Sequence, residues 1–280
     1  MYEPMPPAFH HEPLRVAQDT FLVRQLPGEG QAPVNVYINS LVIRGRQPVV
    51  VDTGGANDRE QWLRDVFGLV DPKDVRWVFI SHDDSDHTGN VAEVLDACPN
   101  ATLVGSWFMW ERMASAIKLP LHRMLWLNDG DSFDAGDRTF GVIRPPIYDS
   151  PTTRGLFDSK TGVYWASDAF GTVVPGPADH VGDLDPGFWQ EAFGTFQIMG
   201  SPWLEIVDRA QFATTVRRIE DLGVATLATA HGPLISGPYV QKAFAMARAA
   251  AGQAAAPHFG DEVRQAMVEA ILQVHGEAAA

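Results

Sequence analysis

Residues 81–90 read SHDDSDHTGN and follow the apolar run 75–80. That run has the composition of a buried strand. Two histidines flank three aspartates that lie within four residues, and carboxylates this close repel one another. A bound divalent cation removes that conflict. A solvated acidic loop is the alternative, but such a loop need not follow a buried strand. The segment therefore indicates a metal site at the end of a strand.

Three further apolar segments, each predicted as a strand, end in side chains that can bind a metal ion. These side chains are the pair Tyr148-Asp149, Asp168 and His231. Strand ends hold side chains rigidly, as coordination geometry requires. Together with His82, they are expected to meet at one edge of the fold.

The pattern His82-x-Asp84-x-Asp86-His87 resembles the ligand signature of the metallo-β-lactamase superfamily. Upstream, residues 52–54 read Asp-Thr-Gly, which is similar to the segment that precedes the ligand loop in that fold. The resemblance runs from about residue 34 to about residue 234. It implies an α/β (α+β) fold of the αββα sandwich type, with two sheets packed face to face between helices and with C-terminal helices.

The residue at the second ligand position of the motif indicates which branch of the superfamily the chain resembles. Hydrolases of the superfamily usually have histidine there, whereas this chain has Asp84. Flavodiiron proteins and their single-domain, oxygen-binding diiron relatives carry a carboxylate. Residues 38–40, 167–171 and 230–233 also resemble the strand, bridging-aspartate and last-ligand segments of that branch.

One ligand of that branch is missing, because no histidine lies in residues 123–179. Asp149 lies between His87 and Asp168 at a spacing that resembles that of the missing histidine. We expect Asp149 to replace it, with Tyr148 as the competing residue.

The resulting assignment has seven ligands for two metal ions. Metal one takes His82, Asp84 and Asp149, metal two takes Asp86, His87 and His231, and Asp168 bridges both. Oxygen-rich sets favour iron(II) or manganese(II), whereas zinc prefers more nitrogen or sulfur. Iron is therefore expected, although zinc also accepts aspartate. No catalytic residue is assigned, and Asp52 and Tyr148 are candidates for hydrogen bonds behind the ligands.

The flavodiiron resemblance implies a function in redox chemistry, in which dioxygen or nitric oxide binds between two iron ions and is reduced. The residues after His231 read as helices, and no Gly-rich flavin loop is visible, so electrons are expected from a separate partner protein. A dinuclear zinc hydrolase is the alternative, since two metals can activate a bridging water. Anionic ligands weaken Lewis acidity, which counts against hydrolysis. A non-catalytic oxygen or nitric-oxide sensor is the third hypothesis.

Composition limits the partners. A formal net charge of -14 disfavours nucleic acid and anionic membranes as partners. The single cysteine, Cys98, excludes an intramolecular disulfide and is expected to be a buried thiol. There is neither a signal-peptide pattern nor an apolar run of eighteen residues, so the cytoplasm is the expected compartment. The oligomeric state is open, a homodimer included.

The expected organisation is a structureless segment at 1–15, a metallo-β-lactamase-like domain at 16–250 and a helical tail at 251–280. Four local expectations concern single elements. They are a capping box at Asn57 and Glu60, a helix over 107–126 broken at Pro120, a mobile lid over 173–186, and one amphipathic helix over 204–222.

Overall fold

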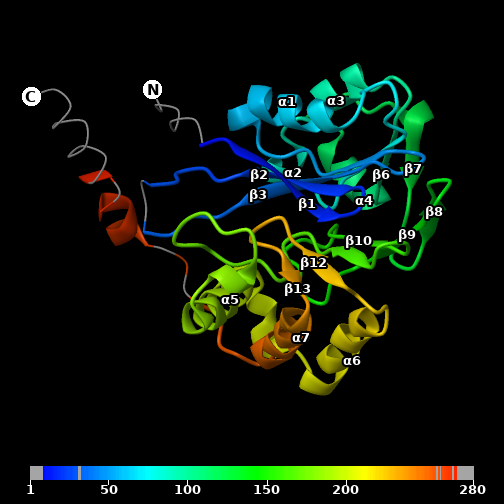
Figure 1. Cartoon of the computed structure of the whole chain (residues 1–280). Helices are drawn as coiled ribbons and strands as arrows, with labels where there is room; N and C mark the ends of the chain where they lie inside the picture. Colours follow the sequence, from blue (N-terminus) through cyan, green and yellow to red (C-terminus); the bar gives the residue numbers. More distant parts are fainter. Residues whose placement is uncertain (1–8, 31–32, 257, 259, 267, 270–280) are drawn as a thin grey trace, which may run out of the picture.

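The computed structural model describes residues 9–30, 33–256, 258, 260–266 and 268–269. Within them, two β-sheets pack face to face and helices cover both outer faces (Figure 1). The predicted αββα sandwich is thus confirmed. No helix among these residues combines the length and apolar character needed to cross a bilayer.

The first sheet has seven strands in the order in which they occur along the chain. They are β1 (His11–Ala17), β2 (Thr20–Gln25), β3 (Ile38–Ile43), β4 (Val49–Val51), β5 (Trp77–Phe79), β6 (Thr102–Gly105) and β7 (Met124–Trp126). Strands β1 to β4 pair antiparallel, whereas β4 to β7 pair parallel. Because parallel strands end at the same edge, the residues that follow β4 and β5 lie side by side.

The second sheet has six strands in the order β13-β12-β11-β10-β9-β8. They are β8 (Ser132–Asp134), β9 (Thr139–Ile143), β10 (Gly155–Asp158), β11 (Val163–Trp165), β12 (Thr226–Ala228) and β13 (Ile235–Ser236). The pair β11 and β12 is parallel, and Trp165 lies opposite Ala228. Asp168 and His231 follow these two strands, so both leave the same edge of the sheet.

The core has three layers, one between the two sheets and one between each sheet and its helices. Alternate side chains along each strand point into different layers. Val49, Val51 and Phe79 point between the sheets and pack there with Phe140 and Trp165. The residues between them along each strand point outward instead. The strands are therefore buried on both faces, which explains their continuous apolar runs.

Two groups of helices cover the outer faces of the sheets (Figure 1). Helices α1 (Arg59–Leu69) and α3 (Val91–Ala97) cover the first sheet. Helices α5 (Pro186–Gly200), α6 (Arg209–Glu220) and α7 (Pro238–Ala250) cover the second. Cys98 is buried against the first group, as predicted, and burial raises the pKa of its thiol to about 11.

Three of the local helix expectations are wrong. The segment 107–126 is helical only over α4 (Trp107–Met113), and its end forms strand β7, because pairing with β6 outweighs helical propensity. Helix α6 starts at Arg209, where the Asp208 side chain accepts a bond from the Gln211 amide. Asn57 lies in the 3-10 turn Ala56–Asp58, so the capping box is absent.

Two segments are more ordered than expected. Residues 173–186, which were expected to form a mobile lid, are held to the rest of the fold by two isolated β-bridges, Asn35–Val174 and His180–Leu234. Val181 in this segment is buried. Residues 11–15 of the segment expected to be structureless belong to β1, because they complete the edge of the first sheet. Residues 1–8 lie outside the described residues.

Candidate metal centre

The ligand loop begins where β5 ends and contains one short helical turn, α2 (Ser85–Thr88). His82 precedes this turn, and His87 lies within it. Gly89 lies so close to residue 54 that a Cβ on it would come within 2.6 Å of the Gly54 carbonyl oxygen. The Asp-Thr-Gly segment after β4 and the ligand loop after β5 therefore fit together only with glycine at position 89.

Asp52 holds this loop from behind. Its side chain is fully buried and accepts hydrogen bonds from His87 Nδ1 at 2.8 Å and from Trp165 Nε1 at 3.0 Å. The Ser81 amide and hydroxyl donate two more, at 2.6 and 2.7 Å. This is the supporting arrangement expected for Asp52. It orients the His87 ring so that Nε2 faces the centre.

The other two imidazoles are fixed in the same way. His231 Nδ1 donates a hydrogen bond to the Tyr37 carbonyl oxygen at 2.7 Å. His82 Nδ1 lies 3.1 Å from Ser167 Oγ and 3.3 Å from Ser81 Oγ. Each ring thus uses Nδ1 for the protein and keeps Nε2 for a ligand. The roles of Ser81 and Ser167 were not predicted, because they depend on tertiary contacts.

Backbone strain accompanies this positioning. Asp52 and Ser167 both have φ of 55°, in the left-handed region that non-glycine residues rarely adopt. Both follow a strand and directly support an imidazole of the cluster. Strain of this kind is typical of functional sites, where the surrounding structure enforces it.

Asp168 lies at the middle of the cluster. Its carboxylate oxygens are 3.0 Å from His87 Nε2, 3.4 Å from His231 Nε2 and 3.6 Å from His82 Nε2. His82, Asp168 and His231, which follow β5, β11 and β12, therefore meet at one edge of the fold. The expectation that Asp149 also follows a strand is wrong, because Asp149 lies in the long loop between β9 and β10.

All seven residues predicted as ligands lie in this cluster. They form three groups whose potential ligand atoms are within 4.8 Å of one another: His82, His87 and Asp168; Asp86, His87 and His231; and His82, Asp84 and Asp149. The Nε2 atoms of His82 and His87 are buried and have no hydrogen-bond partner among the described residues. Buried polar atoms without partners are costly. Two cations would satisfy them, so the residues fit a dinuclear metal centre.

The geometry favours Asp149 over Tyr148 at the position of the missing histidine. Asp149 Oδ2 lies 3.9 Å from His82 Nε2. The Tyr148 ring instead packs against Trp203, with ring centroids 4.8 Å apart. The Arg144 Cζ atom lies over the same ring, 5.1 Å from its centroid.

Asp83 has a role that the sequence did not reveal. Its carboxylate accepts hydrogen bonds from Arg112 Nε at 2.5 Å and from Thr152 Oγ1 at 2.6 Å. Thr152 belongs to the loop that contains Asp149, so Asp83 ties that loop to the ligand loop. The only sequence signal was an acidic residue at a variable position of the ligand motif.

A cavity of about 230 Å³ adjoins the centre. Its lining includes Tyr148, Phe196 and Met199 together with Asp149, Asp168 and His231 of the cluster. His258 is exposed and lines the same cavity.

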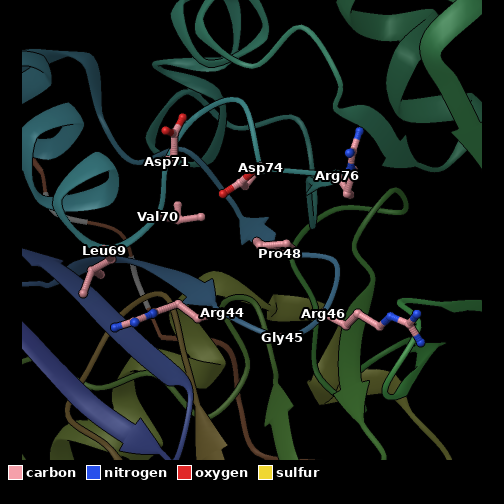
Figure 2. Close-up of a pocket in the computed structure, with 9 residues that line it drawn as sticks. All are labelled: Arg44, Gly45, Arg46, Pro48, Leu69, Val70, Asp71, Asp74 and Arg76. Atoms are coloured by element: carbon pink, nitrogen blue, oxygen red, sulfur yellow. The ribbon is translucent and has the colours of Figure 1, made fainter.

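A larger cavity of about 460 Å³ lies at the other edge of the first sheet. It is lined by residues that precede β4 and β5, whereas the metal cluster follows them. In Figure 2 the side chains of Arg44, Arg46 and Arg76 point away from one another. They do not converge on a common ligand, and this cavity contributes nothing to the metal centre.

Replacing Asp149 with alanine is expected to lower occupancy at one metal position and spare the other. Asp149 belongs only to the group with His82 and Asp84, and the second group is complete without it. Metal analysis of the purified variant would show about one ion per chain in place of two. Retention of two ions would shift the assignment to Tyr148 or to water.

Metal affinity is expected to rise as the pH increases from 6 to 8. Burial disfavours a charged His231, but the Asp168 carboxylate outweighs it and raises the pKa of His231 to about 8. Burial and repulsion by Asp168 raise the pKa of Asp149 to about 6. These protons must leave when a cation binds. Affinity should gain about tenfold per pH unit for each proton released. Calorimetry at pH 6, 7 and 8 measures this, and an unchanged affinity would contradict it.

Comparison with known proteins finds a matching family model and similar curated proteins. A family model described as ODP family beta lactamase matches residues 35–232. Diflavin flavoprotein A 3 of Nostoc sp. is 30% identical over 232 residues, which cover 79% of this chain and 39% of that protein. This chain therefore spans about two fifths of the length of that relative.

Two solved structures share the fold. The rubredoxin oxygen:oxidoreductase of Desulfovibrio gigas matches with a TM-score of 0.71 and 18% identity, over 85% of this chain and 61% of that one. The flavodiiron protein of Giardia intestinalis matches with a TM-score of 0.73 and 16% identity, over 86% and 60%. At such identities the likeness concerns the fold alone.

Proposed function

Because the chain belongs to the ODP family of beta lactamases, we propose that it is a flavodiiron-type oxidoreductase that binds and reduces dioxygen or nitric oxide. The seven clustered residues hold two metal ions, with iron as the resident metal. Electrons come from a partner outside this chain. The names of the relatives support this proposal, since they include a diflavin flavoprotein and an oxygen:oxidoreductase.

One observation carries the proposal: buried imidazole nitrogens, which have no hydrogen-bond partner in the described part of the chain, face a cluster rich in carboxylates. Four carboxylates and three imidazoles form a hard, electron-rich set. Such ligands stabilise the higher oxidation state of iron, so the reduced centre gives up electrons readily. A hydrolase would need the opposite, a strongly Lewis-acidic metal with fewer anionic ligands.

Different residues of this chain have different roles at the centre. When bound, two iron(II) ions supply electrons and open coordination positions to a diatomic ligand. Asp168 lies between the imidazoles and holds the two positions together. Asp52 and Ser167 keep the rings in orientation. The adjoining cavity admits a small molecule, and Phe196 and Met199 in its wall limit the water around it.

The proposal is tested by measuring oxygen consumption with an excess of reductant. Protein loaded with iron(II) under anaerobic conditions is expected to consume many equivalents of dioxygen per chain, whereas zinc-loaded protein consumes none. Uptake that stops at one equivalent would indicate a sensor. Efficient hydrolysis of a lactone or phosphodiester by the zinc-loaded protein, with no oxygen uptake by the iron-loaded protein, would indicate a hydrolase instead.

A further inference from the structure

The two halves of the metal centre differ in their donor atoms. The group His82, Asp84 and Asp149 offers one imidazole and two carboxylates. The group Asp86, His87 and His231 offers two imidazoles and one carboxylate. Asp168 adds a carboxylate that both share, since it lies within 3.6 Å of all three Nε2 atoms. The donor atoms at the first position are thus mainly oxygen, and half of the donor atoms at the second position are nitrogen.

The difference originates at position 149, and the fold keeps it in place. The Asp149 loop is tied to the ligand loop by the bonds of Asp83 to Thr152 and Arg112. Thr153 Oγ1 lies 3.5 Å from Asp149 Oδ1 on the same loop. A carboxylate is therefore held beside His82 where a second imidazole would make the two positions alike.

Exposure to solvent differs in the same sense. The carboxylates of both positions are partly exposed, at 52% for Asp84, 26% for Asp149 and 30% for Asp86, whereas the imidazoles are buried or nearly so. The first position has two such exposed carboxylates, and the second has one. A cation at the first position can therefore keep water ligands more easily than one at the second. Manganese(II) prefers carboxylate and water ligands, whereas zinc(II) suits imidazole.

We propose that the two positions have unequal cation preferences, so that, when two different divalent ions compete, the ion that prefers imidazole binds beside His231 and the ion that prefers oxygen binds beside Asp149. The inference rests on the dinuclear centre of the proposed function, and it adds that its two metal positions are unequal. Affinities rise from manganese to iron to zinc at any site of this kind. Zinc therefore takes the two-imidazole position first and leaves the other to manganese.

The test uses the whole chain, stripped of metal and supplied with one equivalent each of zinc(II) and manganese(II). Metal analysis is expected to find one of each ion per chain. Because zinc is diamagnetic, nearly all the manganese should give the six-line electron paramagnetic resonance signal of an isolated ion. Anomalous scattering from crystals should place manganese beside His82 and Asp149, and zinc beside His87 and His231.

Two matched variants change the asymmetry in opposite directions. Asp149→His supplies the second imidazole and should make the first position as attractive to zinc as the second. With the two positions made alike, the ions should fill them at random, so only about half of the manganese would lie beside zinc and give the isolated signal. Asp86→His places a third imidazole at the second position and should sharpen the selection.

The outcomes separate this inference from the proposed function. Random filling in the unchanged protein, or zinc beside Asp149, would overturn the inference while leaving a dinuclear centre. The same distribution in Asp149→His as in the unchanged protein would also overturn it. Fewer than two ions bound in total would overturn both.

Discussion

Replacing Asp168 with alanine is expected to remove both metal ions, the largest effect of any single change in the centre. Among the residues that the structure describes, Asp168 is the one carboxylate near all three imidazoles, and its oxygens lie 3.0 to 3.6 Å from their Nε2 atoms. Without it, neither group keeps its shared ligand, and three imidazoles face one another across the centre. Total metal content should fall from two ions to well below one per chain.

Metal analysis and thermal unfolding, each on protein prepared with and without added iron(II), would measure this. Unchanged protein should melt at a higher temperature with metal, because a ligand that binds only the folded state stabilises it. The Asp168→Ala protein should show no such rise. Asp96→Ala, which removes an exposed aspartate of α3, serves as the control and should behave like the unchanged protein. Two retained ions in Asp168→Ala would contradict the bridging assignment.

Replacing Arg138 with methionine is expected to cost about 3–5 kcal/mol of unfolding free energy. The Arg138 side chain is fully buried between the β8–β9 turn and its neighbours. Its guanidinium pairs with Asp19, with Asp158 at 2.9 Å and with Asp137 at 2.9 Å. Asp19 lies in the β1–β2 turn, so this cluster fastens the two sheets at the end opposite the metal centre. Methionine would leave Asp158, which is 2% exposed, without its cation.

Urea unfolding of the metal-free proteins measures this cost without interference from metal binding. Arg218→Met is the matched control, because Arg218 pairs with Asp129 at 2.7 Å while its side chain is 47% exposed. That pair should contribute no more than about 1 kcal/mol. Equal losses in the two variants would show that the buried cluster has no special role in stability.

The residues at the metal centre were predictable because their spacing reports on both chemistry and topology. His82, Asp168 and His231 each follow an apolar run, and parallel strands bring such ends to one edge. Asp149 was harder to find, since no strand leads directly to it. The sequence predicted a strand that ends at the pair Tyr148-Asp149, and Asp149 was preferred over Tyr148 because it stands at the spacing of the missing histidine.

Other features depend on contacts that no local pattern records. Strand β7 has three residues in an aromatic segment and exists because β6 offers it a partner. Helix α5 was missed, although Asp185 before Pro186 is a good start signal, because the preceding loop is rich in Gly and Pro. The hydrogen bonds of Ser167 and Asp83 join segments more than sixty residues apart. Sequence periodicity contains no information on such pairs.

The proposed reaction is tested most directly by mixing anaerobic, iron(II)-loaded protein with dioxygen in a stopped-flow spectrophotometer. The carboxylate-rich ligand set predicts a rapid change in the visible spectrum that requires two iron ions per chain and is absent from Asp168→Ala. Protein loaded with a single iron should react poorly. No spectral change in the fully loaded protein, together with efficient zinc-dependent hydrolysis of a lactone or phosphodiester, would contradict a diiron oxidoreductase and identify a hydrolase.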